Sequence, residues 1–463
     1  MEEGGTFFLG ECHHGQWLLV TDLAGLAGDV KITMRKNLNA DAMFGAIRKD
    51  FAKIADHRAT NRKIPLVDAL MSGFAMFSLK DQSLLAFDER RFDEPESLHG
   101  VFGVRVIPCD SQMRSILDGV TPDSLRQSFR TLFNLAQRDK ALEKLVWLDG
   151  HYLLALDGTG IYSSAKVSSP YCMKKLRRNG QIEYYQQMLG AAIVHPDRRV
   201  VLPLCSEMII MQDGSTKQDC ERNATGRFLV KFRQDHPHLK CVVVEDGLSS
   251  NGPHIIDLID HNLRFILGAK PGDHAHLFAQ LDRAIEAGDA TEFSQTIQGE
   301  PGVSHTYRFV NGISLNKSNP DLLVNVLEYW QLDSKGKETR FSWVTDLPLT
   351  TDNVHQIMRA GRARWRIENE VFNTLKNQGY NLEHNFGLGE KHLSAVFNHL
   401  MMLAFLVDQI QQLCCPLFQA ALQRCKRKRT LWQSIRSYFE LFVMPSMEVI
   451  LQSIVAGVRI VFR

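Results

Sequence analysis

The 463-residue sequence lacks the features that mark secreted, zinc-scaffolded or membrane proteins. Its nine cysteines are odd in number and form no Cys-x-x-Cys pair, which argues against a disulfide framework or a structural zinc site and favours a reducing cytosolic setting. Glu2 and Glu3 stand where a secretory signal would carry basic residues. The most apolar C-terminal stretch, residues 400–407, is too short to span a bilayer and is followed by Asp408. We therefore expect a soluble, cytoplasmic protein.

A strong net charge is also missing. The formal charge is +2, with 44% hydrophobic and 23% charged residues, which is ordinary for a globular protein. The cations are nevertheless clustered, in Arg424, Lys426, Arg427, Lys428, Arg429 and Arg436, in Arg359, Arg362, Arg364 and Arg366, and in Lys174, Lys175, Arg177 and Arg178. Such groups can follow a phosphate backbone, although a charge run is more often a solvated helix face. The net charge therefore does not indicate whether the protein binds nucleic acid.

The order of hydrophobic patterns predicts an α/β protein with a layered core. Leu66, Leu70, Phe74 and Phe77 have helical spacing within a mainly helical N-terminal region, residues 1–145. Residues 146–296 then contain apolar runs typical of a covered sheet, at 152–156, 191–194, 200–204, 240–244 and 264–267. Residues 297–350 are β-rich, and we expect a β insertion with turns at Asn311-Gly312 and at 334–336. Residues 351–413 return to helix and to the core, and 414–463 form a basic helical region.

Three carboxylates in three different settings are the main functional signal. Asp157 follows the apolar run 152–156, Asp246 follows the run 241–244, and each is followed by glycine. Glu368 lies in a segment with helical spacing. If both strand ends open on the same edge of a sheet, the three can meet. Oxygen ligands suit Mg²⁺ or Mn²⁺, and two such ions support phosphodiester chemistry. An Asp-Gly pair alone is more often a turn or a helix cap, so the prediction rests on the combination.

The helix around Glu368 adds a basic residue to this group. Ile367, Val371 and Leu375 recur every four residues and are expected to face the core. Arg364 precedes Glu368 by four residues and shares its side of the helix. It could orient the glutamate, bind a phosphate, or form a solvated ion pair.

These residues resemble the DDE transposases of bacterial insertion sequences, specifically the cut-and-paste group with a β-strand insertion domain. The motifs are Leu156-Asp157-Gly158-Thr159, Glu245-Asp246-Gly247 and Arg364-Trp365-Arg366-Ile367-Glu368, the last similar to the family's Tyr-Arg-Glu-Lys signature. The similarity covers about residues 64–413. It implies an RNase H-like core with two Mg²⁺ ions (Mn²⁺ possible) held by Asp157, Asp246 and Glu368. It also implies a homodimer that synapses the element ends, a DNA hairpin intermediate, and transesterification into target DNA near the bacterial nucleoid.

The resemblance also suggests residues that bind DNA: Arg364, Arg366, Lys376, Lys174 and Lys175. The N-terminal region is expected to recognise the terminal inverted repeats. Two positions depart from the signature. Gly361 stands where the tyrosine is expected, and Leu375 where the lysine is expected, with Lys376 one residue later. On an α-helix that shift turns the side chain by about 100°.

Two other functions remain open at this stage: an RNase H-like nuclease that does not rejoin strands, and a DNA-binding relic whose catalysis has decayed. Trp343 in the insertion could stack on an extruded base, but a strand tryptophan is more often core. Trp432 lies near the basic run 426–429. His195 and His254 are expected to be structural.

Overall fold

The computed structural model describes residues 7–8, 19–20, 32, 34–211 and 218–457. The chain divides into two compact units, one formed by residues 1–141 and 374–463 and the other by residues 142–373. Glu2 and Glu3 lie outside the described residues. The first unit thus joins the N-terminal and C-terminal helical regions, and the second contains all three predicted carboxylates.

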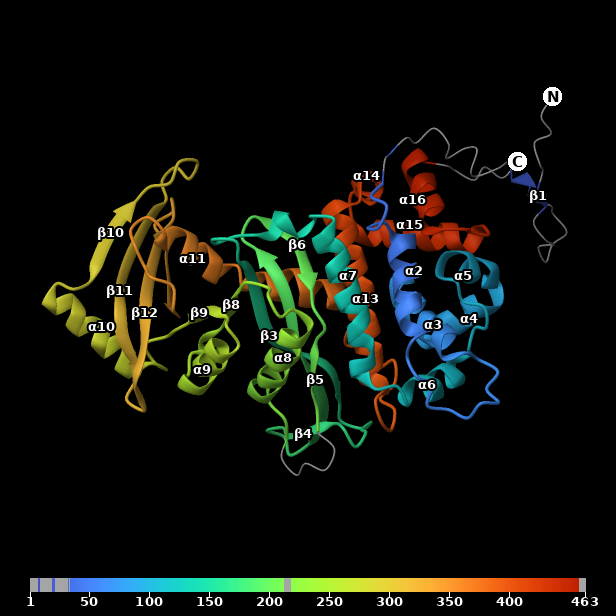
Figure 1. The fold of residues 1–463 in the computed structure, drawn as a ribbon, viewed down its shortest axis with the longest axis horizontal. Helices are drawn as coiled ribbons and strands as arrows, with labels where there is room; N and C mark the ends of the chain where they lie inside the picture. Colours follow the sequence, from blue (N-terminus) through green and yellow to red (C-terminus); the bar gives the residue numbers. More distant parts are fainter. Residues whose placement is uncertain (1–6, 9–18, 21–31, 33, 212–217, 458–463) are drawn as a thin grey trace. The chain divides into compact units, whose positions relative to one another are not determined.

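The first unit is helical where it is described, apart from the short pair β1 (Phe7–Phe8) and β2 (Leu19–Val20) (Figure 1). Its helices are α2 (Ala40–Phe51), α3 (Leu66–Leu79), α4 (Leu84–Asp93), α5 (Pro95–Phe102), α6 (Asp110–Asp118), η1 (Pro122–Leu125), α7 (Arg126–Arg138), most of α12 (Asn373–Asn377), α13 (Leu393–Cys414), α14 (Pro416–Cys425), α15 (Lys428–Leu441) and α16 (Met447–Ala456). Helices α3 and α13 pack against each other and are buried on nearly all sides. Both are apolar around most of their circumference, which is typical of helices in the centre of a core.

Helix α13 corrects the expectation drawn from residues 400–407. It is 22 residues long with a mean hydropathy of 1.5, so by length and composition it could cross a membrane. However, 94% of its apolar window is buried inside the protein. The core helix of a soluble protein passes the same test, because a helix covered on all sides needs no polar face.

A buried ion pair links α3 to α13 within this unit. The Lys80 ammonium follows α3 and contacts the Asp408 carboxylate, which also accepts a hydrogen bond from the Tyr380 hydroxyl. Lys80 lies over the Trp432 ring, 3.9 Å from its centroid, and Trp432 is itself buried. Burial lowers the pKa of Lys80, and Asp408 opposes that shift. Trp432 is therefore a core residue, while Arg424, Lys426, Arg427 and Arg429 remain exposed.

Removing one partner of this pair should destabilise the first unit. We expect Asp408→Ala to lower the free energy of unfolding by about 3–5 kcal/mol, because Lys80 is left buried without a counter-charge. Urea denaturation measures the change. The exposed pair of Asp110 and Arg114 is the control, and Asp110→Ala should cost no more than about 1 kcal/mol. An Asp408→Ala protein as stable as wild type would contradict the argument.

The second unit is built on one mixed sheet, which contains eleven strands among the described residues. The strands are β3 (Tyr152–Ser164), β4 (Met173–Leu176), β5 (Ile182–His195), β6 (Arg198–Pro203), β7 (Glu207–Ile209), β8 (Cys241–Glu245), β9 (Arg264–Gly268), β10 (Thr291–Gln295), β11 (Ser304–Asn316), β12 (Asn319–Leu332) and β13 (Glu338–Thr345). Its helical segments are η2 (Leu142–Leu145), α8 (Glu221–Asp235), η3 (Gly247–Ser249), α9 (Gly252–Asp260), α10 (Ala275–Ala287), α11 (Val354–Arg362) and η4 (Ile367–Phe372). The α/β class predicted from the sequence is confirmed.

Three parallel strands in the middle of the sheet set the position of the site. The strand order is β10-β11-β12-β13-β9-β8-β3-β5-β4, with β6 and β7 also pairing with β5. Strands β3, β8 and β9 run parallel to one another, and β5 runs antiparallel to β3. The carboxyl ends of neighbouring parallel strands lie at the same edge of the sheet. Their apolar residues are buried on both faces, as the continuous runs predicted.

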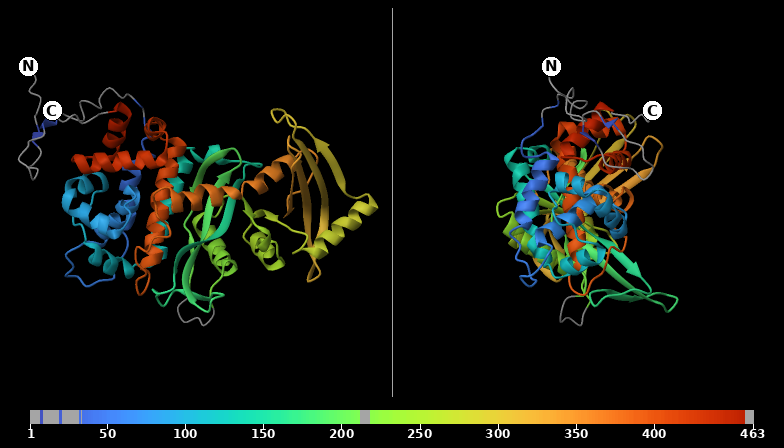
Figure 2. Two further views of the ribbon diagram at one scale, coloured as in Figure 1. Left: turned by 180° about the vertical axis from the view of Figure 1, so that it is seen from behind. Right: turned by 90° about the vertical axis from the view of Figure 1, so that its right-hand side faces the viewer.

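The β-rich insertion extends this same sheet. Strand β13 pairs with β9, and the long hairpin of β11 and β12 continues the sheet outward with α10 packed against β11 (Figure 2). The turn expected at Asn311-Gly312 is wrong: β11 passes through these residues with a register shift between Val310 and Ile313. The hairpin turns instead between Asn316 and Asn319. Gly312 has a φ of +73°, which fits an irregular position in a strand as well as a turn.

Candidate active site

Asp157 lies within a strand, although the sequence suggested a strand end. Strand β3 continues to Ser164, paired with β5. Its parallel partner β8 stops earlier, since the last paired residues are Ala155 and Val244. Asp157 therefore stands just beyond the end of β8, where β3 loses its neighbour on one side. The side chain is 21% exposed, and its Oδ1 accepts a hydrogen bond from the Gly158 amide at 2.9 Å.

Asp246 follows the last residue of β8, as expected. Its Oδ1 accepts a hydrogen bond from the Leu248 amide at 3.0 Å, so that it caps the short helical turn η3. The preceding Glu245 is buried and pairs with His254, which anchors α9 beside the strand end. His254 is structural in this sense, as predicted. Asp246 thus has a capping role and also faces the site.

Glu368 belongs to a π-helical turn, η4, which interrupts the helix predicted over this region. Ile367, Val371 and Leu375 are fully buried, as their spacing predicted. A π-turn holds one more residue than an α-turn and often occurs at functional sites. Leu375 and Lys376 follow this turn in the α-helix α12, where one residue still rotates the side chain by about 100°. Lys376 itself lies in the first unit and pairs with Glu383 at 2.8 Å.

A glycine allows the Glu368 segment to approach the sheet. Gly190 on β5 is the register partner of Asp157, so both positions project to the same face. A β-carbon at Gly190 would lie 2.5 Å from Cε1 of Phe372. The Phe372 ring therefore occupies the place of a side chain at position 190, directly beside Asp157. This close packing was not readable from the sequence.

Arg364 joins two of the predicted carboxylates. Its Nη1 lies 3.0 Å from Oδ2 of Asp157, and its Nη2 lies 2.7 Å from Oε1 of Glu368. Its side chain is 14% exposed, whereas that of Glu368 is 45% exposed. The pair with Glu368 is thus no simple surface pair, because the same guanidinium also bonds a residue 207 positions away in the sequence.

A fourth carboxylate, which the sequence reasoning missed, lies at the same place. Glu221 begins α8, accepts a hydrogen bond from the Gly158 amide, and lies so close to Gly158 that a side chain there would collide with it. Burial raises the pKa of Asp157 to about 7; Arg364 opposes the shift, and Glu221, Glu368 and Asp246 add to it. Burial also raises the pKa of Glu221, with Asp246 contributing. No pattern in the sequence singled out Glu221, because its contact with Gly158 joins α8 to β3 across a long stretch of chain.

The donor set fits hard divalent cations. Four carboxylates from β3, α8, the end of β8 and η4 repel one another, and oxygen ligands are those that Mg²⁺ and Mn²⁺ prefer. Within residues 34–211 and 218–457, no three acidic, histidine or cysteine side chains already stand at coordinating spacing. Arg364 stands between Asp157 and Glu368 instead. A bound cation would thus compete with this guanidinium for the same oxygens.

The other predicted residues are more dispersed. Arg366 donates to the Pro196 carbonyl at 2.7 Å and pairs with Glu370 at 3.3 Å. Lys174 and Lys175 lie on the edge strand β4, where Lys174 pairs with Tyr184 of β5, itself the partner of Ser164 at the end of β3. Ser164 is seven residues along β3 from Asp157, or roughly 23 Å at the rise of a strand. These two lysines are therefore remote from the carboxylates, and their binding of DNA stays a prediction.

The departure at Gly361 has a structural counterpart. The Trp343 indole packs against this glycine, and a β-carbon there would lie 2.5 Å from the indole nitrogen. Trp343 is 5% exposed and stacks on Phe341 with ring centroids 5.7 Å apart. A tyrosine at position 361 would not fit without moving Trp343. Trp343 is thus largely buried and also contributes to the wall of a pocket beside Asp246.

Comparison with known proteins gives little beyond this geometry. No family model and no curated protein matches the chain. Among solved structures, it is similar to piggyBac transposase in a synaptic complex with hairpin DNA, with 10% identity and a TM-score of 0.38 over 88% of this chain and 82% of that chain. A similarity this low carries no argument, so the case for a function rests on the site.

The fit between Gly190 and Phe372 can be tested by substitution. We expect Gly190→Ala to cost about 1–3 kcal/mol of unfolding free energy, because the new methyl group overlaps the ring. Adding Phe372→Leu should recover part of that loss, which denaturation of both single variants and the double variant measures. Gly160→Ala on β3 is the matched control, since nothing lies within 4 Å of its β-carbon position. Equal effects of the two glycine substitutions would refute the packing argument.

Proposed function

We propose that this chain is a DNA transposase, a metal-dependent enzyme that cuts DNA strands at the ends of an insertion sequence and transfers them into target DNA. The observation that carries the proposal is the convergence of Asp157, Asp246 and Glu368, from a strand, a strand end and a helix, around Arg364. Carboxylates this crowded are unfavourable without a cation. Divalent cations in such a site serve phosphodiester chemistry in particular.

The carboxylates, Arg364 and the buried side chains beside them would each have a different role in this chemistry. Asp157, Asp246 and Glu368 would hold the metal, with Glu221 beside them. Bound cations would supply activation of the attacking oxygen and stabilisation of the leaving oxygen. Arg364 has the guanidinium geometry that bonds a phosphate through two nitrogens, and it can exchange a carboxylate for that phosphate. The buried wall formed by Ile367, Val371 and Phe372 limits water on one side of the carboxylates.

The strand order supports an RNase H-like core. A central strand, β3, has an antiparallel neighbour, β5, on one side and two successive parallel strands, β8 and β9, on the other. The acids lie at the carboxyl edge of the parallel strands. The finer parts of the proposal follow from the sequence resemblance: membership of the bacterial cut-and-paste group, a hairpin intermediate, a synaptic homodimer, and action at the nucleoid. A nuclease without strand transfer is the main alternative.

Cleavage of the element's own end is the direct test. A labelled duplex that carries this end, taken from the flanking genomic DNA, should be cut by the wild-type chain with Mg²⁺. Asp157→Ala, Asp246→Ala and Glu368→Ala should each reduce cutting at least about 10³-fold, the range typical of essential catalytic groups, while DNA binding is retained. Gel analysis of the products also separates strand transfer from hydrolysis alone.

The control for charge is Asp260→Ala, at the exposed end of α9, which should leave cleavage unchanged. Cutting that survives loss of one of the three carboxylates would remove that residue from the site. Binding without any cutting by the wild type would instead favour a decayed relic, and hydrolysis without joined products would favour the nuclease.

Metal binding gives a second test that does not depend on cleavage. Saturating Mn²⁺ should raise the melting temperature of the wild-type chain, because a ligand at 100 times its Kd stabilises by about 2.7 kcal/mol. Asp246→Ala should abolish this gain. Arg364→Gln should lower the Kd for Mn²⁺, since the competing guanidinium is gone. Thermal melts over a series of Mn²⁺ concentrations measure the change in both variants. An Arg364→Gln protein that binds Mn²⁺ more weakly than wild type would contradict the proposed competition between the guanidinium and the metal.

A further inference from the structure

A pocket of about 430 Å³ opens directly beside Asp246. Its walls come from the end of β8, the segment after β9, strand β13 and helix α11, and they include the aromatic rings of Phe341, Trp343 and Trp365. Four cationic side chains also line it: Lys270, Arg340, Arg362 and Arg364. Aromatic rings with cations are the usual lining of sites for single-stranded nucleic acid.

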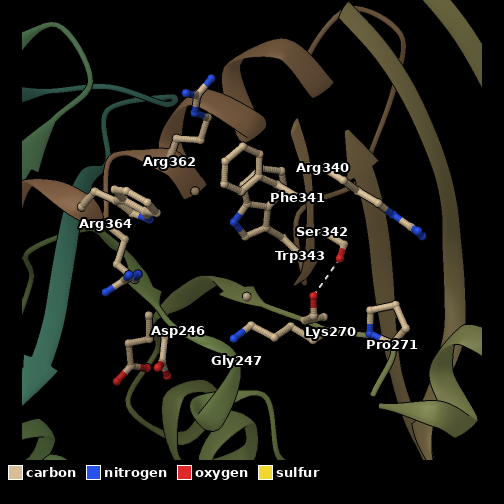
Figure 3. A pocket seen from close by; sticks show the side chains of 15 residues that line it. Asp246, Gly247, Lys270, Pro271, Arg340, Phe341, Ser342, Trp343, Arg362 and Arg364 are labelled. Carbon is tan, nitrogen blue, oxygen red and sulfur yellow. Dashed lines mark hydrogen bonds between the residues drawn. The ribbon is translucent and has the colours of Figure 1, made fainter. Parts of the chain in front are cut away.

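The four cations are not equivalent. Figure 3 shows Arg340 and Arg362 directed away from the centre of the pocket, whereas Lys270 extends beneath Trp343 towards Asp246. Arg340 pairs with Glu328, and Arg362 lies over the Phe341 ring and bonds Gln331. Arg364 is engaged by two carboxylates. In the described part of the chain, no acidic group lies within 4.0 Å of the Lys270 ammonium, so no ion pair competes with a ligand for it.

The backbone around Lys270 is fixed on both sides. Ala269 exchanges hydrogen bonds with Ser342: its amide donates to the Ser342 carbonyl at 2.9 Å, and the Ser342 hydroxyl donates to its carbonyl at 2.7 Å. On the other side, the Lys270 carbonyl accepts from the His274 amide at 3.0 Å, and the His274 ring contacts the Ser250 carbonyl at 3.0 Å. The lysine is thus held at the carboxyl end of β9, next to Asp246 at the carboxyl end of β8. Lys270 itself is exposed, so that a ligand can reach its ammonium from solvent.

We propose that Lys270 is a positioning residue that binds a DNA phosphate beside Asp246, in the pocket that it forms with β13 and α11. The inference rests on the proposed function and deepens it, because it names which cation holds the strand next to the carboxylates. A phosphodiester at this place would be the anionic partner that the Lys270 ammonium does not have in the free protein. Among the aromatic rings of the pocket, Trp365 is 54% exposed and offers a face on which a base of the same strand can stack.

The test compares Lys270→Ala, Lys270→Arg and Lys240→Ala in the full chain. Lys240 is the matched control. It is an exposed lysine just before β8, and so it lies at the amino ends of the three parallel strands, whereas Lys270 follows the carboxyl end of β9. The first measurement is binding of a short fluorescein-labelled single-stranded oligodeoxynucleotide with Ca²⁺ over a salt series. Loss of one phosphate contact should reduce the slope of log K against log salt by about 0.7. The second is single-turnover cleavage of the element-end duplex at saturating protein.

We expect Lys270→Ala to show the smaller slope and to cut about 10–100-fold more slowly, the cost of a misplaced substrate. Lys270→Arg should keep the slope and most of the rate, and Lys240→Ala should match wild type in both. An unchanged Lys270→Ala, or an equal loss in Lys240→Ala, would overturn the role of Lys270 while leaving the enzyme class standing. A wild-type chain that neither binds nor cuts DNA would overturn both, and thermal melts of each variant exclude unfolding as the cause.

Discussion

Mutual repulsion among four carboxylates is the constraint around which the second unit is organised. Asp157, Glu221, Asp246 and Glu368 come from four elements, and the last three each raise the cost of ionising the half-buried Asp157. Arg364 offsets part of this cost by bonding Asp157 and Glu368 together. An arrangement of this kind costs stability, because a carboxylate that is shielded from water is harder to ionise beside other carboxylates.

The sheet brings these groups together by ending its strands at different points. Strand β8 stops at Glu245, while β3 continues past Asp157 with β5 as its partner. Beyond the end of β8, Asp157 has no strand neighbour on that side, and Asp246 and Glu221 lie there. Gly190 then lets the Phe372 ring lie against the sheet, which sets the height of Glu368 above Asp157. A single missing side chain thus determines how closely the glutamate segment approaches.

The β insertion takes part in the same site because it belongs to the same sheet. Strand β13 pairs with β9, so that Trp343 stands opposite Gly268 and next to the segment that carries Lys270. The pocket beside Asp246 therefore has one wall from the core and one from the insertion. Packing of Trp343 against Gly361 ties the insertion to helix α11, which precedes Arg364 in the chain. The pocket between the core and the insertion is therefore lined by both acidic and cationic side chains, Asp246 and Lys270 among them.

The sequence by itself determined the α/β class, most strands and the partnership of Arg364 with Glu368, and it named three carboxylates as candidates, because apolar runs and four-residue spacing are local signals. It did not determine that Asp157 lies within a long strand, that Glu368 occupies a π-turn, or that Lys174 and Lys175 lie on the edge strand β4, remote from the acids. Nor did it reveal Glu221 or Lys270. These depend on strand register and on which segments pack together, and both are set by contacts between residues far apart in the chain. Local pattern names the candidates, and only the tertiary structure decides which of them meet.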